Sequence, residues 1–359
     1  MALRLPLRRR PGTAGGARLA GLHVFVPLRP AGDRRRHLPV HPGARRHPGL
    51  RRPGLRRPGR RRAWGEPPVS ARRVVITADD YGYDPASAEV VRGLLRDGHV
   101  SATTVLAVSE HLDRVAPGLA ALHEHGELKG HSGFGIGLHL ATSSDRGREP
   151  WAPLSPEGAA LADPDGNLPA DPAVAEARAT PRVIAAEVAA QLARVEGLGL
   201  AADRIDSHSG TVYGLRGGAG LAPALAACAE RRLALRLPRT LDAALLGGEV
   251  PAALARAHRR AVEAADASGV ALPQMILTDP RPTDRIGAYE SLRDFYTGLL
   301  PMLPEGTSEV LAHPGADTPW ARRRFGAGWD KRVWEARLLR DPAWHEALER
   351  EGVEVVAHW

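Results

Sequence analysis

Short β-prone runs alternate with helical patterns from residue 73 to residue 359, and this alternation constrains the fold more than any other feature. The expected strands are 73–78, 101–107, 134–139, 203–206, 233–237, 274–278, 308–312 and 353–357. The expected helices lie between them, at 86–98, 109–126, 182–198, 220–232, 252–267, 288–301 and 329–350. Strands that alternate with helices usually form a parallel sheet with the helices outside it. The sequence therefore predicts an α/β fold.

Eight strands match the number in a (β/α) barrel. A doubly wound open sheet is the alternative, but its first strand usually leads into a glycine-rich phosphate turn. Here the first strand runs into Ala78-Asp79-Asp80-Tyr81-Gly82, with no G-x-G-x-x-G pattern. We therefore predict a barrel of parallel strands that is irregular or incompletely closed. The insertion at 140–180 is rich in Pro, Asp and Gly and is expected to be a long loop.

The basic charge of the chain belongs to its first part. The net charge is +8, yet residues 1–73 hold 20 Arg and only two acids, so the remainder has 29 basic and 39 acidic residues. An acidic body argues against binding to a phosphate backbone there. Residues 1–72 lack apolar periodicity and are predicted to be a disordered Arg/Pro/Gly-rich extension. Three interpretations fit such an extension: an arm that binds nucleic acid, a transit peptide, or a start codon that was assigned too early in the gene.

The remaining composition excludes several classes of protein. The single cysteine, Cys228, excludes an internal disulfide framework and a cysteine-rich zinc site. No apolar run approaches the ~20 residues of a membrane span. The apolar segment 21–28 is short and is interrupted by His23 and Pro27, so it fits a secretory signal poorly. We expect a cytoplasmic protein with no membrane partner, and the oligomeric state is left open, a homodimer included.

Residues suited to catalysis follow the expected strands. Asp79 and Asp80 follow the first strand, His139 closes the third, Asp206 and His208 the fourth, Arg236 the fifth, and His313 the seventh. The carboxyl ends of barrel strands form one face, and that face carries the active site. Residues scattered over a surface would not sort in this way. The sequence therefore predicts a site at this face.

Each of these residues also has a purely structural interpretation. The pair Asp79-Asp80 could be a solvated turn, His139 a core histidine bonded to a carbonyl, and Asp206 the cap of a turn. Taken together, one or two carboxylates and two neutral imidazoles suit a divalent-metal site with open positions for water. The same ligands occur in oxygenases, but the chain lacks the jelly-roll pattern of that class.

Four ordered motifs, ITADDYG, GLHL, IDSH and AHPG, resemble the YdjC/ChbG family of carbohydrate deacetylases. The resemblance runs from about residue 73 to the C-terminus and includes AAEVAAQLARVEGLG and RVWEARLL. It implies an irregular (β/α) barrel of the glycoside hydrolase and deacetylase type over residues 73–359. It also implies a metal-dependent hydrolase that removes acetyl groups from N-acetylated sugars such as chitooligosaccharides.

The motifs carry the family's residue roles onto this chain. The resemblance implies that Asp80, His139 and His208 bind a divalent metal ion, Mg²⁺ or Zn²⁺. It matches Asp79 to the catalytic carboxylate and His313 to the catalytic histidine. One segment departs from the family: residues 206–212 are DSHSGTV, where the family often has DSHxHxH. This departure bears on chitooligosaccharide specificity more than on hydrolysis.

The sequence thus predicts an amide hydrolase that acts on the C–N bond of an acetylated amino sugar or oligosaccharide and releases acetate. Arg236 is expected either to orient Asp79 through a bidentate contact or to form a surface salt bridge, and Asp206 to orient a neighbour or contact the substrate. Three alternatives stay open: a barrel phosphoesterase, a catalytically altered homologue that only binds sugar, and a nucleic-acid-binding protein that works through its Arg-rich extension.

Overall fold

A computed structural model describes residues 71–125, 128–129, 133–145, 150–241 and 249–359. Its strands are β1 (Arg72–Tyr81), β2 (Ala102–Val105), β3 (Gly135–Leu140), β4 (Arg204–Ser207), β5 (Ala234–Leu235), β6 (Ile276–Leu277), β7 (Gly306–Ala312) and β8 (Glu354–Val355). Its helices are α1 (Pro85–Arg96), α2 (Leu112–His125), α3 (Pro172–Arg178), α4 (Pro181–Gly197), α5 (Leu221–Arg231), α6 (Ala252–Ala267), α7 (Thr283–Ile286), α8 (Tyr289–Leu299), α9 (Pro319–Phe325), α10 (Trp329–Leu338) and α11 (Pro342–Arg350).

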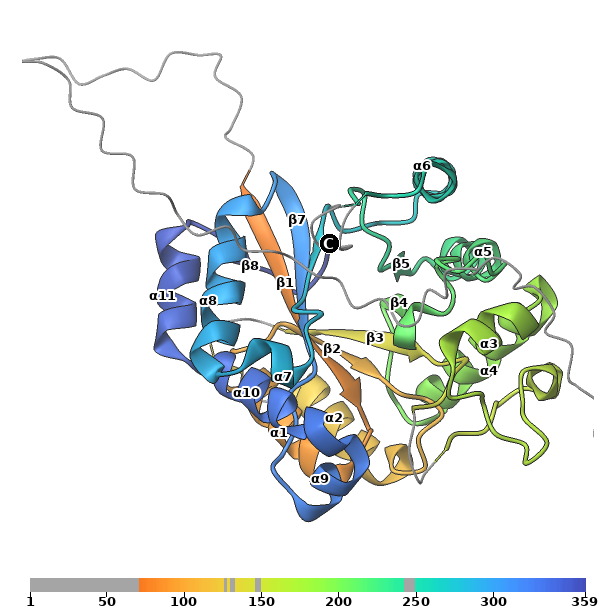
Figure 1. Ribbon diagram of the computed structural model, residues 1–359, viewed down its shortest axis with the longest axis horizontal. Helices are drawn as coiled ribbons and strands as arrows, with labels where there is room; N and C mark the ends of the chain where they lie inside the picture. Colours follow the sequence, from red (N-terminus) through yellow and green to blue (C-terminus); the bar gives the residue numbers. More distant parts are fainter. Residues whose placement is uncertain (1–70, 126–127, 130–132, 146–149, 242–248) are drawn as a thin grey trace, which may run out of the picture.

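The strands form one parallel sheet in the order β5-β4-β3-β2-β1-β7-β6, with β8 beside β1. The sheet curls into a half-barrel, and helices surround it, with α8 and α11 beside β1 and β7 and with α4 and α5 beyond β3 and β4 (Figure 1). A strand lies within or beside each of the eight segments predicted from the sequence. The predicted α/β fold with parallel strands in an irregular, incompletely closed barrel is confirmed.

The eighth strand does not lie between β7 and β1, as it would in a regular barrel. β1 and β7 pair directly, from Arg72 with Gly306 to Ala78 with Ala312. β8 instead pairs with Arg73 and Val74 at the start of β1. That edge is open to it because β2 begins to pair with β1 only at Thr77.

Two predictions about helices were wrong. The single helix expected over 329–350 is two helices, α10 and α11, because Pro342 cannot continue a helix and Asp341 caps the new one by accepting from the Ala343 N–H. The insertion at 140–180 is not all loop. It contains a 3₁₀ turn at Glu157–Ala160 and α3, which begins at Pro172 with Asp171 as its cap.

The sheet places an apolar layer outside and a polar one inside. Val74 and Ile76, on one face of β1, are 0% and 1% exposed and belong to the main hydrophobic core. Side chains alternate along a strand, so Thr77 and Asp79 share the other face. There the Thr77 hydroxyl donates to the Glu309 carboxylate of β7 at 2.6 Å. The interior of the half-barrel is therefore built from paired polar groups.

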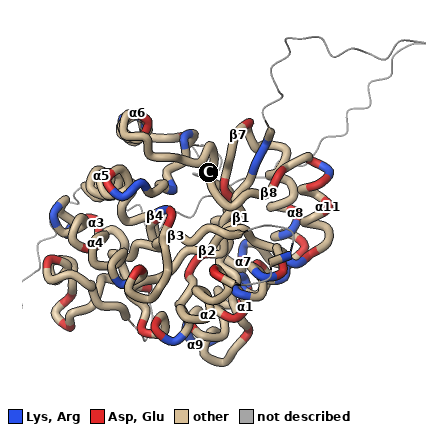
Figure 2. The backbone as a smooth tube through the Cα atoms, turned by 180° about the vertical axis from the view of Figure 1, so that it is seen from behind, with Lys and Arg blue, Asp and Glu red and all other residues tan. Residues whose placement is uncertain are grey.

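Acidic and basic residues are interspersed along the described part of the chain (Figure 2). The predicted disordered extension lies outside the described residues except for Ala71 and Arg72, and Arg72 is the first residue of β1. None of the described helices has the length and apolar character needed to cross a membrane.

Candidate metal centre

A β-bulge at the end of β1 explains how two adjacent carboxylates reach one site. Ala78 pairs with Thr103 and Tyr81 with Val105, so Asp79 and Asp80 together face the single residue Thr104 of β2. Asp80 has a φ of 66°, a left-handed conformation that Asp tolerates better than most residues. A bulge re-aims side chains in this way beside many active sites. Without it, the two carboxylates would point to opposite faces of the sheet.

Asp80, His139 and His208 converge on one point. The Asp80 Oδ1 atom lies 3.2 Å from His139 Nε2 and 3.6 Å from His208 Nδ1, and the two imidazole nitrogens lie 3.2 Å apart. A point equidistant from the three atoms lies about 2 Å from each, which is the usual length of a zinc–nitrogen bond. All three side chains are buried, with at most 6% of each residue exposed.

The outer partners of the two histidines fix which nitrogen faces the centre. His139 Nδ1 lies 2.9 Å from Asp206, its neighbour in register on β4, and His208 Nε2 lies 2.9 Å from Asp145. A carboxylate only accepts, so these two nitrogens carry the protons and His139 Nε2 and His208 Nδ1 present lone pairs. Outer carboxylates of this kind commonly orient metal-bound histidines.

The residues present therefore fit a divalent cation. Three lone pairs face one another, and Asp80 Oδ1 is buried without a hydrogen-bond partner. Burial alone would raise the pKa of Asp80, but the Arg332 guanidinium holds it well below its ordinary value, so this ligand is ionised. Burial lowers the pKa of His208, yet Asp145 and Asp80 raise it to about 9, so the centre favours a positive charge, either a proton on this imidazole or a cation in its place.

Asp79 is held by Arg236, inside the half-barrel. Arg236 follows β5 and donates from Nη1 to Asp79 Oδ2 at 2.7 Å and from Nη2 to Oδ1 at 2.8 Å, while the Thr104 hydroxyl donates to Oδ1 at 2.8 Å. Burial raises the pKa of Asp79, but Arg236 together with His139 and His313 outweighs it, and the pKa lies below the ordinary value. Asp79 is therefore an ionised carboxylate that is held in place.

Arg236 also contacts two other carboxylates, those of Glu309 and Asp206. It donates from Nε to Glu309 Oε2 at 2.8 Å and from Nη2 to Oε1 at 2.7 Å, and its Nη1 contacts Asp206. A second group of ligand-type residues, Asp79, His139 and Asp206, overlaps this network. Arg236 already supplies that group's positive charge, so the group led by Asp80 is the better metal site.

Arg332 of α10 closes the site from the side opposite His139. Its Nη2 donates to Asp80 Oδ2 at 2.7 Å, which leaves Oδ1 facing the histidines. Its guanidinium also lies over the rings of Phe325 and Tyr83, with centroid distances of 4.2 and 5.2 Å. Arg332 therefore keeps Asp80 ionised and restricts it to one ligand atom.

His313 follows β7 and is the most exposed of the predicted site residues, with 33% of its side chain accessible. Its backbone N–H donates to Glu335 of α10 at 2.8 Å, and its Nδ1 lies 4.0 Å from the same carboxylate. Burial lowers its pKa, while Asp80 and Glu335 act to raise it. His313 therefore lies within the electrostatic reach of Asp80 and stays open to a substrate.

The segment that departs from the family forms a short 3₁₀ turn, His208–Gly210. Ser209 and Gly210 have φ values of 54° and 65°, and Val212 beyond them is fully buried. The ring of Trp151, from the insertion, lies 5.1 Å from the His208 ring, centroid to centroid. An aromatic ring from the insertion therefore packs against the histidine that is retained.

The sequence missed four residues that contact the site: Asp145, Glu309, Arg332 and Glu335. Asp145 lies five residues beyond the end of β3, and the serines that precede it give no indication of a metal site. Glu309 sits inside β7, within an expected strand. Arg332 and Glu335 lie on α10, and the helical pattern of the sequence does not show that these two side chains face the site. The arrangement as a whole places a candidate cation site beside a fixed carboxylate and an accessible histidine, a combination that suits the hydrolysis of a carbonyl compound.

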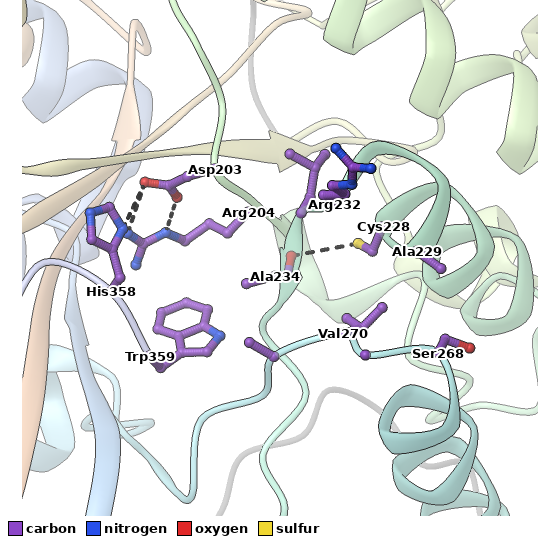
Figure 3. Close-up of a pocket in the computed structure, with 13 residues that line it drawn as sticks. Asp203, Arg204, Cys228, Ala229, Arg232, Ala234, Ser268, Val270, His358 and Trp359 are labelled. Carbon is purple, nitrogen blue, oxygen red and sulfur yellow. Dashed lines mark hydrogen bonds and ion pairs between the residues drawn. The ribbon is translucent and has the colours of Figure 1, made fainter.

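A different pocket, of about 360 Å³, lies at the amino ends of β4 and β5. Figure 3 shows Arg204 between Asp203 and Trp359, with Cys228 on the far wall. The Arg204 guanidinium lies 4.4 Å from the centroid of the Trp359 ring. This pocket shares no residue with the metal centre and lies at the opposite ends of the strands.

A family model described as YdjC-like protein matches residues 73–350. No curated protein sequence matches the chain significantly.

Several solved structures match this chain. A candidate cellobiose-phosphate cleavage protein of Enterococcus faecalis has 22% identity and a TM-score of 0.60, over 80% of this chain and 97% of that one. A lactam utilization protein of Thermus thermophilus has 14% identity and a TM-score of 0.39, over 79% and 99%. An uncharacterized protein of Agrobacterium tumefaciens has 13% identity and a TM-score of 0.43, over 81% and 89%. Of these three, the first supports a shared fold.

Proposed function

The chain belongs to the YdjC-like protein family, and from this premise we propose that it is a metal-dependent hydrolase that removes an acetyl group from an N-acetylated amino sugar or oligosaccharide. Family membership supports a carbohydrate-related hydrolase. The acetyl group, the metal and the residue roles are the proposal. Water adds to the acetyl carbonyl carbon, the C–N bond breaks, and the products are acetate and a free amine.

The observation that carries the proposal is the convergence of three lone pairs. Asp80 Oδ1, His139 Nε2 and His208 Nδ1 lie within 3.6 Å of one another, and Asp206 and Asp145 take the imidazole protons on the outer side. Such an arrangement is repulsive unless a proton or a metal cation lies between the three atoms. Two imidazoles and one carboxylate suit Zn²⁺ better than Mg²⁺, which prefers oxygen ligands.

A cation held there lowers the pKa of bound water and polarises a carbonyl oxygen. Asp79 takes the proton of the attacking water, because Arg236 keeps its carboxylate ionised and in place. Each carboxylate oxygen accepts more than one hydrogen bond, so Asp79 retains the capacity to accept a proton while Arg236 holds it. Arg236 itself acts through Asp79 and is a positioning residue.

His313 donates a proton to the leaving amine nitrogen. Its exposure makes it reachable by a substrate, and Glu335 holds its backbone and one side of its ring. The imidazole of a general acid must be protonated before the C–N bond breaks. Burial holds the pKa of His313 below its ordinary value, and the carboxylates of Asp80 and Glu335 offset only part of that effect in favour of the protonated form.

The test is acetate release by the full chain from a panel of N-acetylated amino sugars, after treatment with a chelator and reloading with Zn²⁺ or Mg²⁺. The proposal expects release only from the reloaded protein. His139→Ala should abolish it, while His123→Ala, which changes a histidine of α2 outside the centre, should not.

The same samples separate the alternatives. Phosphate release from phosphorylated sugars, without acetate release, would make the chain a phosphoesterase. Sugar binding with neither product would make it a binding protein. The assignment of residues 73–359 as the catalytic unit, the cytoplasmic location and the absence of a nucleic-acid partner for that unit remain predictions.

A further inference from the structure

The pocket at the amino ends of β4 and β5 has a volume of about 360 Å³, which is enough for a small organic molecule. Part of its wall is apolar, with Leu233 before β5 and Val270 after α6. Its polar wall holds two arginines, Arg204 and Arg232, and one carboxylate, Asp203. The pocket lies at the strand ends opposite the metal centre, so a molecule bound in it is not the substrate of that centre.

Arg204 of β4 is built into the wall of the pocket. It is 1% exposed, although arginine is rarely buried without partners. Two glycines of β3 make room for it, because a Cβ atom on Gly135 or on Gly137 would overlap the Arg204 side chain. Its Nε donates to Asp203 Oδ1 at 2.5 Å, and its Nη2 donates to the Ala357 carbonyl at 2.6 Å. Its third nitrogen, Nη1, is buried and has no hydrogen-bond partner among the described residues.

The Trp359 ring lies beside the Arg204 guanidinium at the edge of the pocket (Figure 3). The centre of the guanidinium is 4.4 Å from the centroid of the ring. The indole Nε1 is also buried without a partner in the described part of the chain, and an unpaired buried donor is unfavourable. Trp359 is partly exposed and no hydrogen bond fixes its side chain, so the ring can turn and open both nitrogens to a ligand.

The polar groups of the wall that lack partners are donors. Asp203, the carboxylate, already has three partners. Its Oδ1 accepts from Arg204, and its Oδ2 accepts from the Ile136 N–H at 3.2 Å and lies 3.2 Å from His358 Nδ1. The Arg232 side chain, by contrast, forms no ion pair or hydrogen bond with any residue that the structure describes. A ligand that satisfies this wall therefore supplies acceptors, and an anion does so best.

The apolar wall decides which kind of anion fits. Phosphate carries polar oxygens on every side, and those that faced Leu233 and Val270 would lose water without gaining a partner. A carboxylate has its charge at one end and can present an apolar body to the same side chains. The combination of unpaired donors and apolar surface therefore favours an organic carboxylate.

We propose that this pocket binds a small organic monocarboxylate. Its carboxylate accepts from Arg204 Nη1 and Trp359 Nε1, and its apolar body lies against Leu233 and Val270. Arg232, at the rim, adds a second positive charge. The inference does not depend on the proposed hydrolase activity, because it uses no residue of the metal centre.

The test is a titration of the full chain with benzoate, followed through the indole signals of ¹⁵N-labelled tryptophan. The Trp359 signal is identified by its absence from Trp359→Phe. The Arg-rich extension can bind anions by itself, so the readout is this one signal rather than total binding. Benzoate should shift it to saturation, with a Kd about tenfold lower than that of acetate, which lacks the apolar body, or of benzyl alcohol, which lacks the charge. Inorganic phosphate should leave it unshifted.

Three variants place the binding in the pocket. Ala229→Phe fills the pocket from α5 and should abolish the shift, whereas Ala226→Phe, at an exposed position of the same helix, should leave it unchanged. Arg232→Gln should weaken benzoate severalfold and leave benzyl alcohol unaffected, and it keeps the test decisive if Ala229→Phe does not fold. The proposal is overturned if benzoate leaves the Trp359 signal unshifted, if benzyl alcohol or phosphate binds as tightly as benzoate, or if the pocket variants bind benzoate as the wild type does.

Discussion

Replacing Arg236 with methionine would leave three buried carboxylates without their shared cation. Asp79, Asp206 and Glu309 are 2%, 0% and 0% exposed, so water cannot replace the guanidinium. Arg236 donates two hydrogen bonds to Asp79 and two to Glu309, and it contacts Asp206. Methionine keeps much of the volume and removes all of these interactions.

The size of the effect follows from the burial. Removing one partner of a buried ion pair costs about 3–5 kcal/mol, because a charge is left uncompensated. Here three carboxylates lose their partner, so we take this range as a minimum. A domain is stable by only about 5–15 kcal/mol, and the substitution is therefore expected to remove a large part of the free energy of unfolding.

The loss should depend on pH. In the wild type the pKa of Asp79 lies below its ordinary value, so its ionised form contributes stability above the unfolded-state pKa, and this contribution is lost as pH falls through the folded pKa. Without Arg236, burial would raise the pKa of each carboxyl group above its unfolded value. Each would then cost stability that grows as pH rises above that value. The difference between variant and wild type is therefore greater near pH 7 than near pH 5.

Denaturant unfolding followed by tryptophan fluorescence, at about pH 7 and about pH 5, measures both effects. Arg239→Met is the matched control, because its partner Asp266 is exposed and an exposed ion pair contributes little to stability. Adding Glu309→Gln to Arg236→Met should restore part of the stability by removing one uncompensated charge. A loss below about 1 kcal/mol in Arg236→Met, or one equal at both pH values, would refute the reasoning.

Three further perturbations test separate parts of the structure. Glu335→Gln removes a carboxylate that raises the pKa of His313, so the fall of kcat/KM at high pH should move to lower pH; an unchanged pH profile would contradict this. Asp145→Ala removes the acceptor that fixes His208 and should weaken metal binding ~10–100-fold in a metal titration; unchanged affinity would show that Asp145 does not orient the ligand. Removing residues 1–70 should leave the unfolding midpoint and acetate release unchanged, because β1 begins at Arg72; loss of either would mean that the extension is needed.

The sequence predicts the site's strand residues because parallel strands bring their carboxyl ends to one edge. His139 and Asp206 follow from this rule, since β3 and β4 place them side by side in register. The strand rule alone does not bring the adjacent carboxylates Asp79 and Asp80 to one site. A β-bulge against Thr104 does so, and no residue type in VVITADDYG predicts that bulge.

The residues that the sequence missed reach the site by tertiary contact alone. Arg332 is 252 positions from Asp80, and its helical pattern says nothing of the buried carboxylate that it meets. Glu309 lies within an expected strand, where a charged residue is explained by its contacts with Arg236 from across the half-barrel and with the Thr77 hydroxyl. Periodicity shows which face of an element is apolar, but it does not show which polar groups will meet across the interior.

The central claim is that Asp80 holds a metal ion while Asp79 acts as the base, and metal content measured beside acetate release on the same samples tests it most directly. We predict that Asp79→Asn keeps its metal and loses turnover ~10²–10⁴-fold, the usual contribution of a general base. Asp80→Asn should lose the metal and its activity together. If instead Asp79→Asn loses the metal while Asp80→Asn keeps it, or if neither substitution slows acetate release, the account of this site is contradicted.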